Sequence, residues 1–316
     1  MSRCFIGIDT SNYTTSCAAC DENGNVFANI RVPLPVAKGE RGLRQSEAVF
    51  AHVKNLPSAM EGLREAIRGR TVAAVGVSDR PRRCEGSYMP CFLSGVAAAQ
   101  SIAAATDAPL YRFAHQEGHI MAALYSAGKT DLTERKFLAF HVSGGTTEVL
   151  HVKPAELGFS VSLLGGSADL HAGQAIDRIG VRMGLKFPCG KELERLAATF
   201  TGKLPPVRVS VKGVECHLSG LENLAVNLLE KTGDRALVCA FVLEFLAKTL
   251  EKMTAGVEAL CPGLPIVYAG GVMSNAFLQA RLGKRKESYF AKPEFSADNA
   301  AGISLLCRKS FLKENV

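Results

Sequence analysis

The sequence predicts an α/β protein made of two halves of similar build. Predicted strands alternate with predicted helices along the 316 residues, which is typical of sheets covered by helices. A strand–loop–strand pattern near the N-terminus returns after residue 136, and such self-similarity indicates an internal repeat. The composition, 47% hydrophobic and 21% charged, fits a globular chain with enough core for two domains.

The first half opens with three short strands in residues 4–30, which are separated by the polar loop "DTSNYTT" and a tight Asn-Gly turn. The remaining elements follow in order: a helix over about 47–68, a strand over 71–78, a helix over about 91–105, and the segment 108–114, which leads into a helix carrying two histidines.

The second half follows a charged break at residues 129–136 and begins again with strand, small polar loop and strand in "FLAFHVSGGTTEVLHV". The patterns then predict helices near 169–184, 191–200 and 234–260, a strand at 264–271, a helix from Ser274 and a last helix from Ala297.

Two histidines, His115 and His119, stand four residues apart in "FAHQEGHIMAALY". Residues with this spacing share one face of a helix, so both rings can converge on one metal ion. The spacing alone also fits two ordinary rings on a partly buried helix. It does not fit a zinc protease, in which a glutamate directly follows the first histidine. Here Gln116 follows it, and Glu117 points to another side of the helix.

Three loops at predicted strand ends, "DTSNYTT", "SGGTT" and "AGGVMSN", suit a bound phosphate. Glycine lets the backbone approach a phosphate closely and aim N–H groups at it. The third loop also opens a helix, whose N-terminus favours a polar or anionic ligand. Most glycine-rich turns are only turns, but three of them at strand ends favour a nucleotide-binding protein.

Composition limits the class of protein further. The net charge of +7 is compatible with an anionic partner such as a nucleotide or RNA. No apolar run reaches the ~18 residues of a membrane span, and Asp9 stands too early for a signal peptide, so we expect a cytoplasmic protein without a membrane partner. The ten cysteines are too sparse for a disulfide framework, and Cys17 and Cys20 of "SCAAC" should face opposite sides of a sheet.

Several longer motifs stand in the order found in one protein family: "HQEGHI", "VSGGTTEV", "LLGGSADLHAGQAIDRIGVRMGLKFPCGKELERLA", "LSGL", "AGGVMSN" and "ADNAAGIS". From about residue 4 to residue 308 the chain resembles the TsaD family of tRNA threonylcarbamoyladenosine synthases, once described as sialoglycoprotein endopeptidases or glycoproteases. The resemblance implies the actin-like ATPase fold, a duplicated ribonuclease H-like fold with a cleft between two similar α/β domains. We expect one domain over residues 1–130, with the helix 297–316 packing back on it, and a nucleotide-binding domain over 131–296.

The resemblance also implies site residues. It adds Asp298 of "ADNAAG" as a third metal ligand beside His115 and His119, and this set suits one divalent ion, either iron or zinc. The implied nucleotide is ATP or threonylcarbamoyl-adenylate. Its expected contacts are His141, Val142, Ser143, Gly144 and Gly145 in a phosphate loop, Asp177 and Glu194 at the ribose, Gly190, and Asn275.

The chain departs from the family pattern in the first loop. Tyr13 and Thr14 stand where the family has two acids, and Thr146 stands where it has a histidine after "SGG". Cys189 replaces the first glycine of a Pro-Gly-Gly motif. Asp9 is the only carboxylate left in the first loop region, which makes it our candidate for a catalytic contact there.

The family transfers a threonylcarbamoyl group from an adenylate to the exocyclic amine of a tRNA adenosine. We therefore expect a metal-dependent, nucleotide-binding transferase whose partners are tRNA and proteins of the threonylcarbamoyl pathway. Two alternatives remain open: a carbamoyltransferase that acts on a small molecule, and a non-catalytic nucleotide-binding scaffold. A protease is disfavoured, because Gln116 stands where a zinc protease has its water-activating glutamate.

Overall fold

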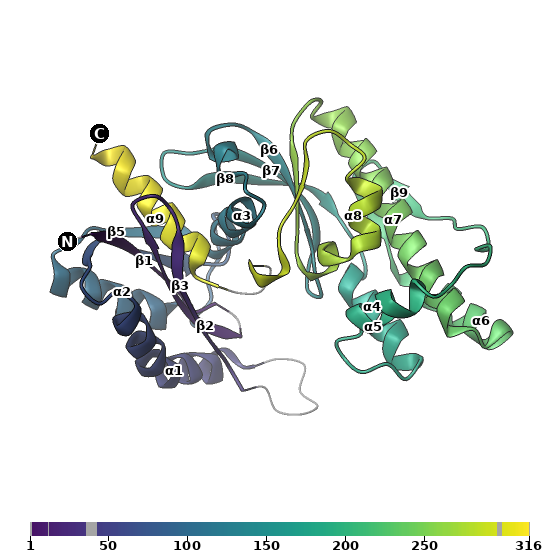
Figure 1. Ribbon diagram of the computed structural model, residues 1–316, viewed down its shortest axis with the longest axis horizontal. Helices are drawn as coiled ribbons and strands as arrows, with labels where there is room; N and C mark the ends of the chain where they lie inside the picture. Colours follow the sequence, from purple (N-terminus) through teal and green to yellow (C-terminus); the bar gives the residue numbers. More distant parts are fainter. Residues whose placement is uncertain (1, 12, 36–42, 296–298, 316) are drawn as a thin grey trace. The chain divides into compact units, whose positions relative to one another are not determined.

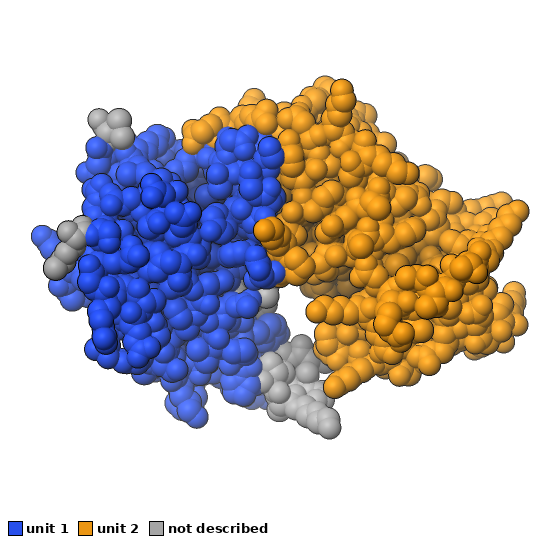
Figure 2. Space-filling view, in the orientation of Figure 1, with its two compact units in different colours: residues 1–133, 153–161, 294–316 blue, residues 134–152, 162–293 orange. Residues whose placement is uncertain are grey.

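The computed structural model of the chain describes residues 2–11, 13–35, 43–295 and 299–315. Contacts divide the chain into two compact units, coloured separately in Figure 2. Unit 1 comprises residues 1–133, 153–161 and 294–316, and unit 2 comprises residues 134–152 and 162–293. Each unit is built around a five-stranded sheet (Figure 1).

The sheet of unit 1 has the strand order β3-β2-β1-β4-β5. The first three strands are antiparallel neighbours, whereas β4 and β5 continue parallel to β1. The predicted Asn-Gly turn joins β2 to β3, and the Asp21 carboxylate closes it by accepting the backbone N–H groups of Asn23 and Asn25. The strands are β1 Arg3–Asp9, β2 Thr14–Asp21, β3 Val26–Pro33, β4 Thr71–Arg80 and β5 Leu110–Ala114.

Helices cover both faces of this sheet. Ile6, Ile8 and Cys17 point to one face, where they pack with apolar side chains of α1 and α2. Cys20 points to the other face, where its thiol donates to the carbonyl of Ser304 in α9. The expected opposite orientation of Cys17 and Cys20 is therefore confirmed. The helices are α1 Gln45–Ala66, α2 Phe92–Thr106, α3 His115–Ser126 and α9 Ala301–Glu314.

The second sheet repeats the topology of the first. Its order is β12-β11-β6-β7-β8, with β6 and β7 antiparallel and with β11 and β12 parallel to β6. In both sheets the first strand is central, the next two lie on one side of it, and the last two lie on the other. The predicted internal repeat is thus confirmed. The strands are β6 Phe137–Val142, β7 Thr147–Pro154, β8 Phe159–Gly166, β11 Ile266–Ala269 and β12 Ser288–Phe290.

The core of unit 2 forms around the long helix α7, which is buried along most of its length between the sheet and shorter helices. Its N-terminus is capped by Asp234, whose carboxylate accepts the backbone N–H of Leu237 at 3.0 Å. The remaining elements are α4 Ala172–Arg182, α5 Gly190–Ala197, the hairpin β9 Ser210–Lys212 and β10 Glu215–His217, α6 Ser219–Thr232, α7 Arg235–Leu260, α8 Ala276–Leu282, and three short 3₁₀ helices at Thr130–Glu134, Gly271–Ser274 and Pro293–Phe295.

The predicted elements are present with boundaries shifted by a few residues. The last helix begins at Ala301 rather than at Ala297, and Ala297 lies outside the described residues. The helix α6 is a further element, which the sequence patterns did not indicate. None of the helices in the described part of the chain combines the length and the apolar composition that crossing a bilayer requires.

Candidate functional site

The histidine pair of unit 1 lies in the first turns of α3, directly after β5. The start of this helix is fixed by Glu117, whose carboxylate accepts the backbone N–H of Ala114 at 2.7 Å. A β-carbon at Gly302 would overlap with the carbonyl of Gly118, so these two glycines let α9 cross α3 in backbone contact. The position of the pair is therefore set by packed main chain.

The two imidazoles point at one another. The Nε2 atoms of His115 and His119 lie 2.8 Å apart, and the rings meet edge to face with their planes at 77°. On the other side of the first ring, Nδ1 of His115 lies 2.7 Å from Oδ2 of Asp9. A neutral His115 with its proton on Nδ1, held by this carboxylate, would present the lone pair of Nε2 toward His119.

Asp9 is buried and its two oxygens are both engaged. Oδ2 faces His115, and Oδ1 accepts the backbone N–H of Ser11 at 2.7 Å. Burial by itself would raise the pKa of this carboxyl, but the charge of His115 and the hydrogen bonds from His115 and Ser11 bring the pKa well below its usual range. Asp9, our candidate for a catalytic contact, is thus placed to orient His115.

The residues present fit the metal that the resemblance implies. Two nitrogens that each lie ~2.1 Å from a common ion can be 2.8 Å apart, and a carboxylate on the far nitrogen is the usual support of a metal-binding histidine. The third expected ligand, Asp298, lies outside the described residues. Among the side chains that are described, no group of three or more histidines, cysteines or acids is arranged to hold an ion.

Glu117 points away from the histidine pair, as the sequence predicts. Its carboxylate is buried, and it accepts the backbone N–H of Phe159 at 2.8 Å and a guanidinium N–H of Arg83 at 2.9 Å. Arg83, from the basic cluster "RPRR", is therefore an ion-pair partner rather than a free surface cation.

Sequence reasoning missed His52 of α1, which is fully buried. Its Nδ1 lies 2.9 Å from the hydroxyl of Thr15, and its Nε2 has no hydrogen-bond partner among the described residues. Burial lowers the pKa of His52, and the nearby charge of Asp9 only partly opposes this effect. No motif marks this residue, because a single histidine on a helix carries no spacing signal.

A cavity of about 740 Å³ lies within unit 2. Its walls come from the glycine loop after β6, from α4 and α5, from α7, and from the turn after β11. A β-carbon at Gly173 would overlap with the backbone of Gly144, so α4 begins directly against the glycine loop. The expected nucleotide contacts that line this cavity are Gly144, Asp177, Gly190, Glu194 and Asn275.

Asp177 holds the turn between α4 and α5. Its Oδ1 accepts the backbone N–H of Cys189 at 2.8 Å, and no bond engages Oδ2 among the described residues. The Cys189 side chain is buried against Gly180, where a β-carbon would overlap with it. The cysteine that replaces a family glycine therefore turns away from the cavity, and Gly190 keeps its place in the wall.

Glu194 and Asn275 meet at the start of α8. Glu194 Oε1 accepts the backbone N–H of Ala276 at 2.7 Å, and Asn275 Oδ1 accepts that of Leu278 at 3.1 Å. We expected this helix N-terminus to receive a polar or anionic ligand. Two of its N–H groups, those of Ala276 and Leu278, are already engaged by these side chains, and Asn275 lines the cavity.

The segment His141 to Gly145 is divided between strand and loop. His141 and Val142 belong to β6, where Val142 is fully buried. Ser143 starts the turn: its N–H donates to the carbonyl of Thr146 at 2.7 Å, and its hydroxyl accepts the N–H of Gly145 at 3.3 Å. Of the five expected contacts in this segment, Gly144 lies in the cavity wall among the described residues, and the other four do not.

The cavity also contains residues that sequence reasoning missed. Lys186 and Lys191 line it on either side of the "FPCG" turn. The ammonium group of neither one is paired with a carboxylate among the described residues, although the backbone N–H of Lys186 donates to Glu192. Phe187 lines it with 68% of its surface exposed. Two cations, an exposed ring and the carboxylates of Asp177, Glu192 and Glu194 line the cavity, and this mixture suits a ligand with phosphate, hydroxyl and aromatic parts.

Comparisons with known proteins agree with this arrangement. The family model described as "TsaD: tRNA N6-adenosine threonylcarbamoyltransferase" matches residues 36–305 and so covers most of the chain. The resemblance found in the sequence is therefore confirmed.

Solved structures share the fold at low identity. The activator of 2-hydroxyisocaproyl-CoA dehydratase from Clostridium difficile with bound ADPNP is 13% identical, with a TM-score of 0.53 over 100% of this chain and 97% of that one. A ROK family glucokinase from Streptomyces griseus in complex with glucose and AMPPNP is 13% identical, with a TM-score of 0.51 over 96% and 98%. Full-length HypF in the phosphate- and nucleotide-bound form is 11% identical, with a TM-score of 0.59 over 98% of this chain and 55% of that one. These similarities confirm the actin-like ATPase fold.

Proposed function

Because this chain belongs to the TsaD family of tRNA N6-adenosine threonylcarbamoyltransferases, we propose that it transfers a threonylcarbamoyl group from an adenylate donor to a tRNA adenosine. The observation that carries the proposal is that five expected nucleotide contacts, far apart in the sequence, line one cavity of unit 2. Its volume of about 740 Å³ lies within the usual range for small-molecule sites, roughly 300–1,000 Å³.

In this proposal the adenylate occupies the cavity. The unengaged Oδ2 of Asp177 accepts hydrogen bonds from the ribose hydroxyls, while Oδ1 keeps the turn at Cys189 in place. Backbone N–H groups at Gly144 approach the phosphate, and the ammonium groups of Lys186 and Lys191 offset its charge. The nucleotide analogues ADPNP and AMPPNP, bound in two proteins of the same fold, support the choice of ligand.

His115 and His119 hold one divalent ion in this proposal, either iron or zinc, with Asp298 as the third ligand. When bound, the ion supplies Lewis-acid stabilisation of negative charge on an oxygen. Asp9 would orient His115 for this role through the hydrogen bond at Nδ1.

The reaction joins the amine nitrogen of the tRNA adenosine to the carbonyl carbon of the donor. The carbon–oxygen bond to the phosphate breaks, AMP leaves with its electron pair, and the amine loses a proton. Incubation of the purified chain with tRNA, threonine, bicarbonate, ATP and an adenylate-forming enzyme tests this function. Threonylcarbamoyladenosine, detected by mass spectrometry in digested tRNA, is the expected product.

One feature of unit 1 favours a different acceptor as the second candidate. Tyr13, with 38% of its surface exposed, and Thr14 bring hydroxyls where the family has acids, so the first loop offers altered contacts to an incoming amine. A carbamoyltransferase acting on a small molecule fits that change. In the same assay, product on a small amine rather than on tRNA would support it, and bound nucleotide without turnover would support a scaffold.

A further inference from the structure

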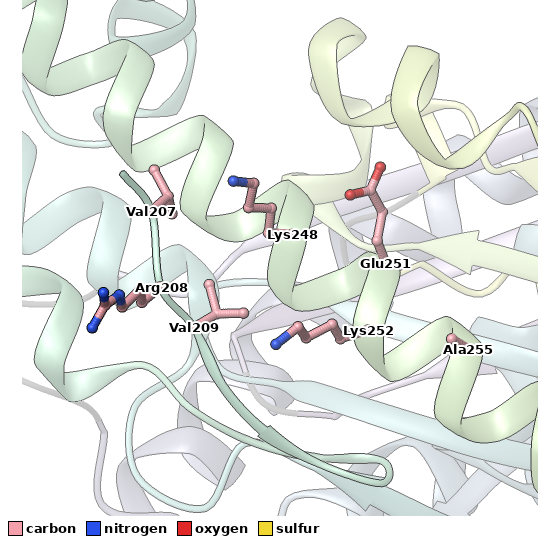
Figure 3. A pocket seen from close by; sticks show the side chains of 7 residues that line it. All are labelled: Val207, Arg208, Val209, Lys248, Glu251, Lys252 and Ala255. Carbon is pink, nitrogen blue, oxygen red and sulfur yellow. The ribbon is translucent and has the colours of Figure 1, made fainter. Parts of the chain in front are cut away.

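A second pocket of unit 2 lies beside α7 and is separate from the nucleotide cavity. It measures about 520 Å³ and is lined by α7 and by the extended segment 207–209 before β9 (Figure 3). The two pockets share no lining residue. Leu243 of the nucleotide cavity and Lys248 of this pocket are five residues apart, and ~100° per residue places them on different sides of α7.

Three cations surround this pocket. Figure 3 shows the charged ends of Arg208, Lys248 and Lys252 directed to the same side. Among the described residues, Arg208 and Lys252 have no carboxylate partner, and Lys248 reaches only Glu244, at 3.7 Å. Three cations gathered at one concave surface, two of them without a carboxylate partner among the described residues, favour an anionic ligand.

The acid that lines the pocket is already neutralised. Both oxygens of Glu251 accept from Arg281, at 2.8 and 2.7 Å, and Arg281 also reaches Glu244 at 2.7 Å. Figure 3 shows the Glu251 carboxylate directed away from the cations. The four cations Arg208, Lys248, Lys252 and Arg281, less the two carboxylates Glu244 and Glu251, leave a local charge of +2.

The pocket is held in place by main-chain packing. A β-carbon at Gly256 would overlap with the carbonyl of Gly213, so the β9–β10 turn rests directly on α7. Val207 and Val209 pack against the core of unit 2. The main chain that carries the three cations is therefore fixed by packing.

We propose that this pocket binds backbone phosphates of an RNA strand, so that the tRNA contacts unit 2 away from the nucleotide cavity. The identity of the RNA rests on the proposed function; the phosphate chemistry rests on the charges. Among the described residues, no aromatic ring and no amide side chain lines the pocket. The pocket therefore suits contacts to the phosphates of an RNA backbone rather than sequence-specific contacts to its bases. Lys248 and Lys252 are ~6 Å apart along the helix, which lets them contact one strand together.

The test compares two triple variants for tRNA binding by fluorescence anisotropy over a range of salt concentrations. One variant is Arg208→Gln with Lys248→Gln and Lys252→Gln. The control is Lys231→Gln with Lys284→Gln and Lys286→Gln, which removes three exposed positive charges elsewhere on unit 2. The pocket variant should bind tRNA at least ~10-fold more weakly near 0.1 M salt, and its salt slope should fall by about 2, because each phosphate contact contributes ~0.7–0.9.

Calorimetry with ATP accompanies the test, and both variants should bind ATP as the unaltered chain does, which shows that unit 2 is folded. Equal salt slopes for the two variants would overturn the proposal. It would also be wrong if the pocket variant lost affinity for ATP or inorganic phosphate but kept its affinity for tRNA, because the pocket would then be a small-anion site. Since the readout is binding, a chain that binds tRNA here without transferring the group would contradict the proposed function and leave this inference standing.

Discussion

His115 and His119 direct their Nε2 atoms at each other across 2.8 Å, from successive turns of α3. Two parts of the fold produce this geometry. The glycine contact between α3 and α9 fixes the helix, and the buried Asp9 carboxylate fixes the ring of His115. A carboxylate that orients an imidazole through its far nitrogen is the usual support of a metal-binding histidine, and this geometry supports the proposed ion.

Replacing one ring should therefore remove the metal. We expect His115→Ala to reduce the iron or zinc content of the purified chain to background, as measured by elemental mass spectrometry. His217→Ala, which removes an exposed imidazole from β10, should leave the metal content unchanged. Unaltered metal in the His115 variant would show that the pair is an ordinary part of a helix surface.

Asp9→Asn tests whether the Asp9 carboxylate supports His115 as a metal ligand. The substitution keeps the volume but loses the charge that holds Nδ1–H of His115. Metal affinity should fall about 10–100-fold, less than in His115→Ala, when the chain competes with a chelator of known affinity. An affinity equal to that of the unaltered chain would mean that Asp9 does not act through His115.

Gly180 and Cys189 should be energetically coupled. In the unaltered chain, Gly180→Ala forces a β-carbon onto the Cys189 side chain, which should cost about 1–3 kcal/mol of unfolding free energy. In a Cys189→Gly background the same change should instead stabilise α4 by up to ~1 kcal/mol, because alanine favours a helix. Urea unfolding of the four proteins measures the coupling, and additive effects would contradict this packing.

Asp169 should contribute stability that depends on pH. It accepts the N–H of Leu218 at 2.8 Å and the hydroxyl of Ser219 at 2.6 Å, and so fixes the start of α6. Burial alone would raise the pKa of Asp169, but these and other hydrogen bonds bring the pKa well below its usual range. A depressed pKa in the folded chain stabilises it above the unfolded pKa, ~3.9, and this contribution disappears as the pH falls toward the folded pKa.

Asp169→Asn should therefore cost about 1–3 kcal/mol of unfolding free energy at pH 7, and the cost should shrink as the pH falls below about 4. Asp107→Asn, a change at the exposed left-handed end of α2, should show neither effect. Urea unfolding at several pH values measures both variants. A cost that does not change with pH would exclude the charge of Asp169 as its source.

Periodicity and the repeated strand–loop–strand pattern were enough to predict an α/β protein with two similar halves, because each element carries its own local signal. The actin-like ATPase fold came from the resemblance to the TsaD family. The cavity was predictable only in part. Gly144 and Asn275 stand near opposite ends of the unit 2 sequence, with Asp177 between them, and a motif marks each of them without showing what surrounds it. The use of Glu194 and Asn275 to satisfy the start of α8 depends on a contact between distant helices, which no local pattern encodes. No sequence motif marks His52 or the cations beside α7. Their surroundings can be recognised only once the fold is known.

The central claim is that unit 2 binds the adenylate part of the donor through Asp177, and calorimetric titration with ATP tests it most directly. Asp177→Asn is the sharpest variant, because its amide oxygen can still accept the N–H of Cys189 while an NH2 group replaces the oxygen that we propose accepts from the ribose. Glu215→Gln, an equal charge change on the exposed β10, is the control. We predict that the unaltered chain and the control bind ATP alike and that Asp177→Asn binds it at least ~10-fold more weakly, as expected for the loss of charged hydrogen bonds. Equal affinity in all three proteins, or no binding by the unaltered chain, would contradict the account.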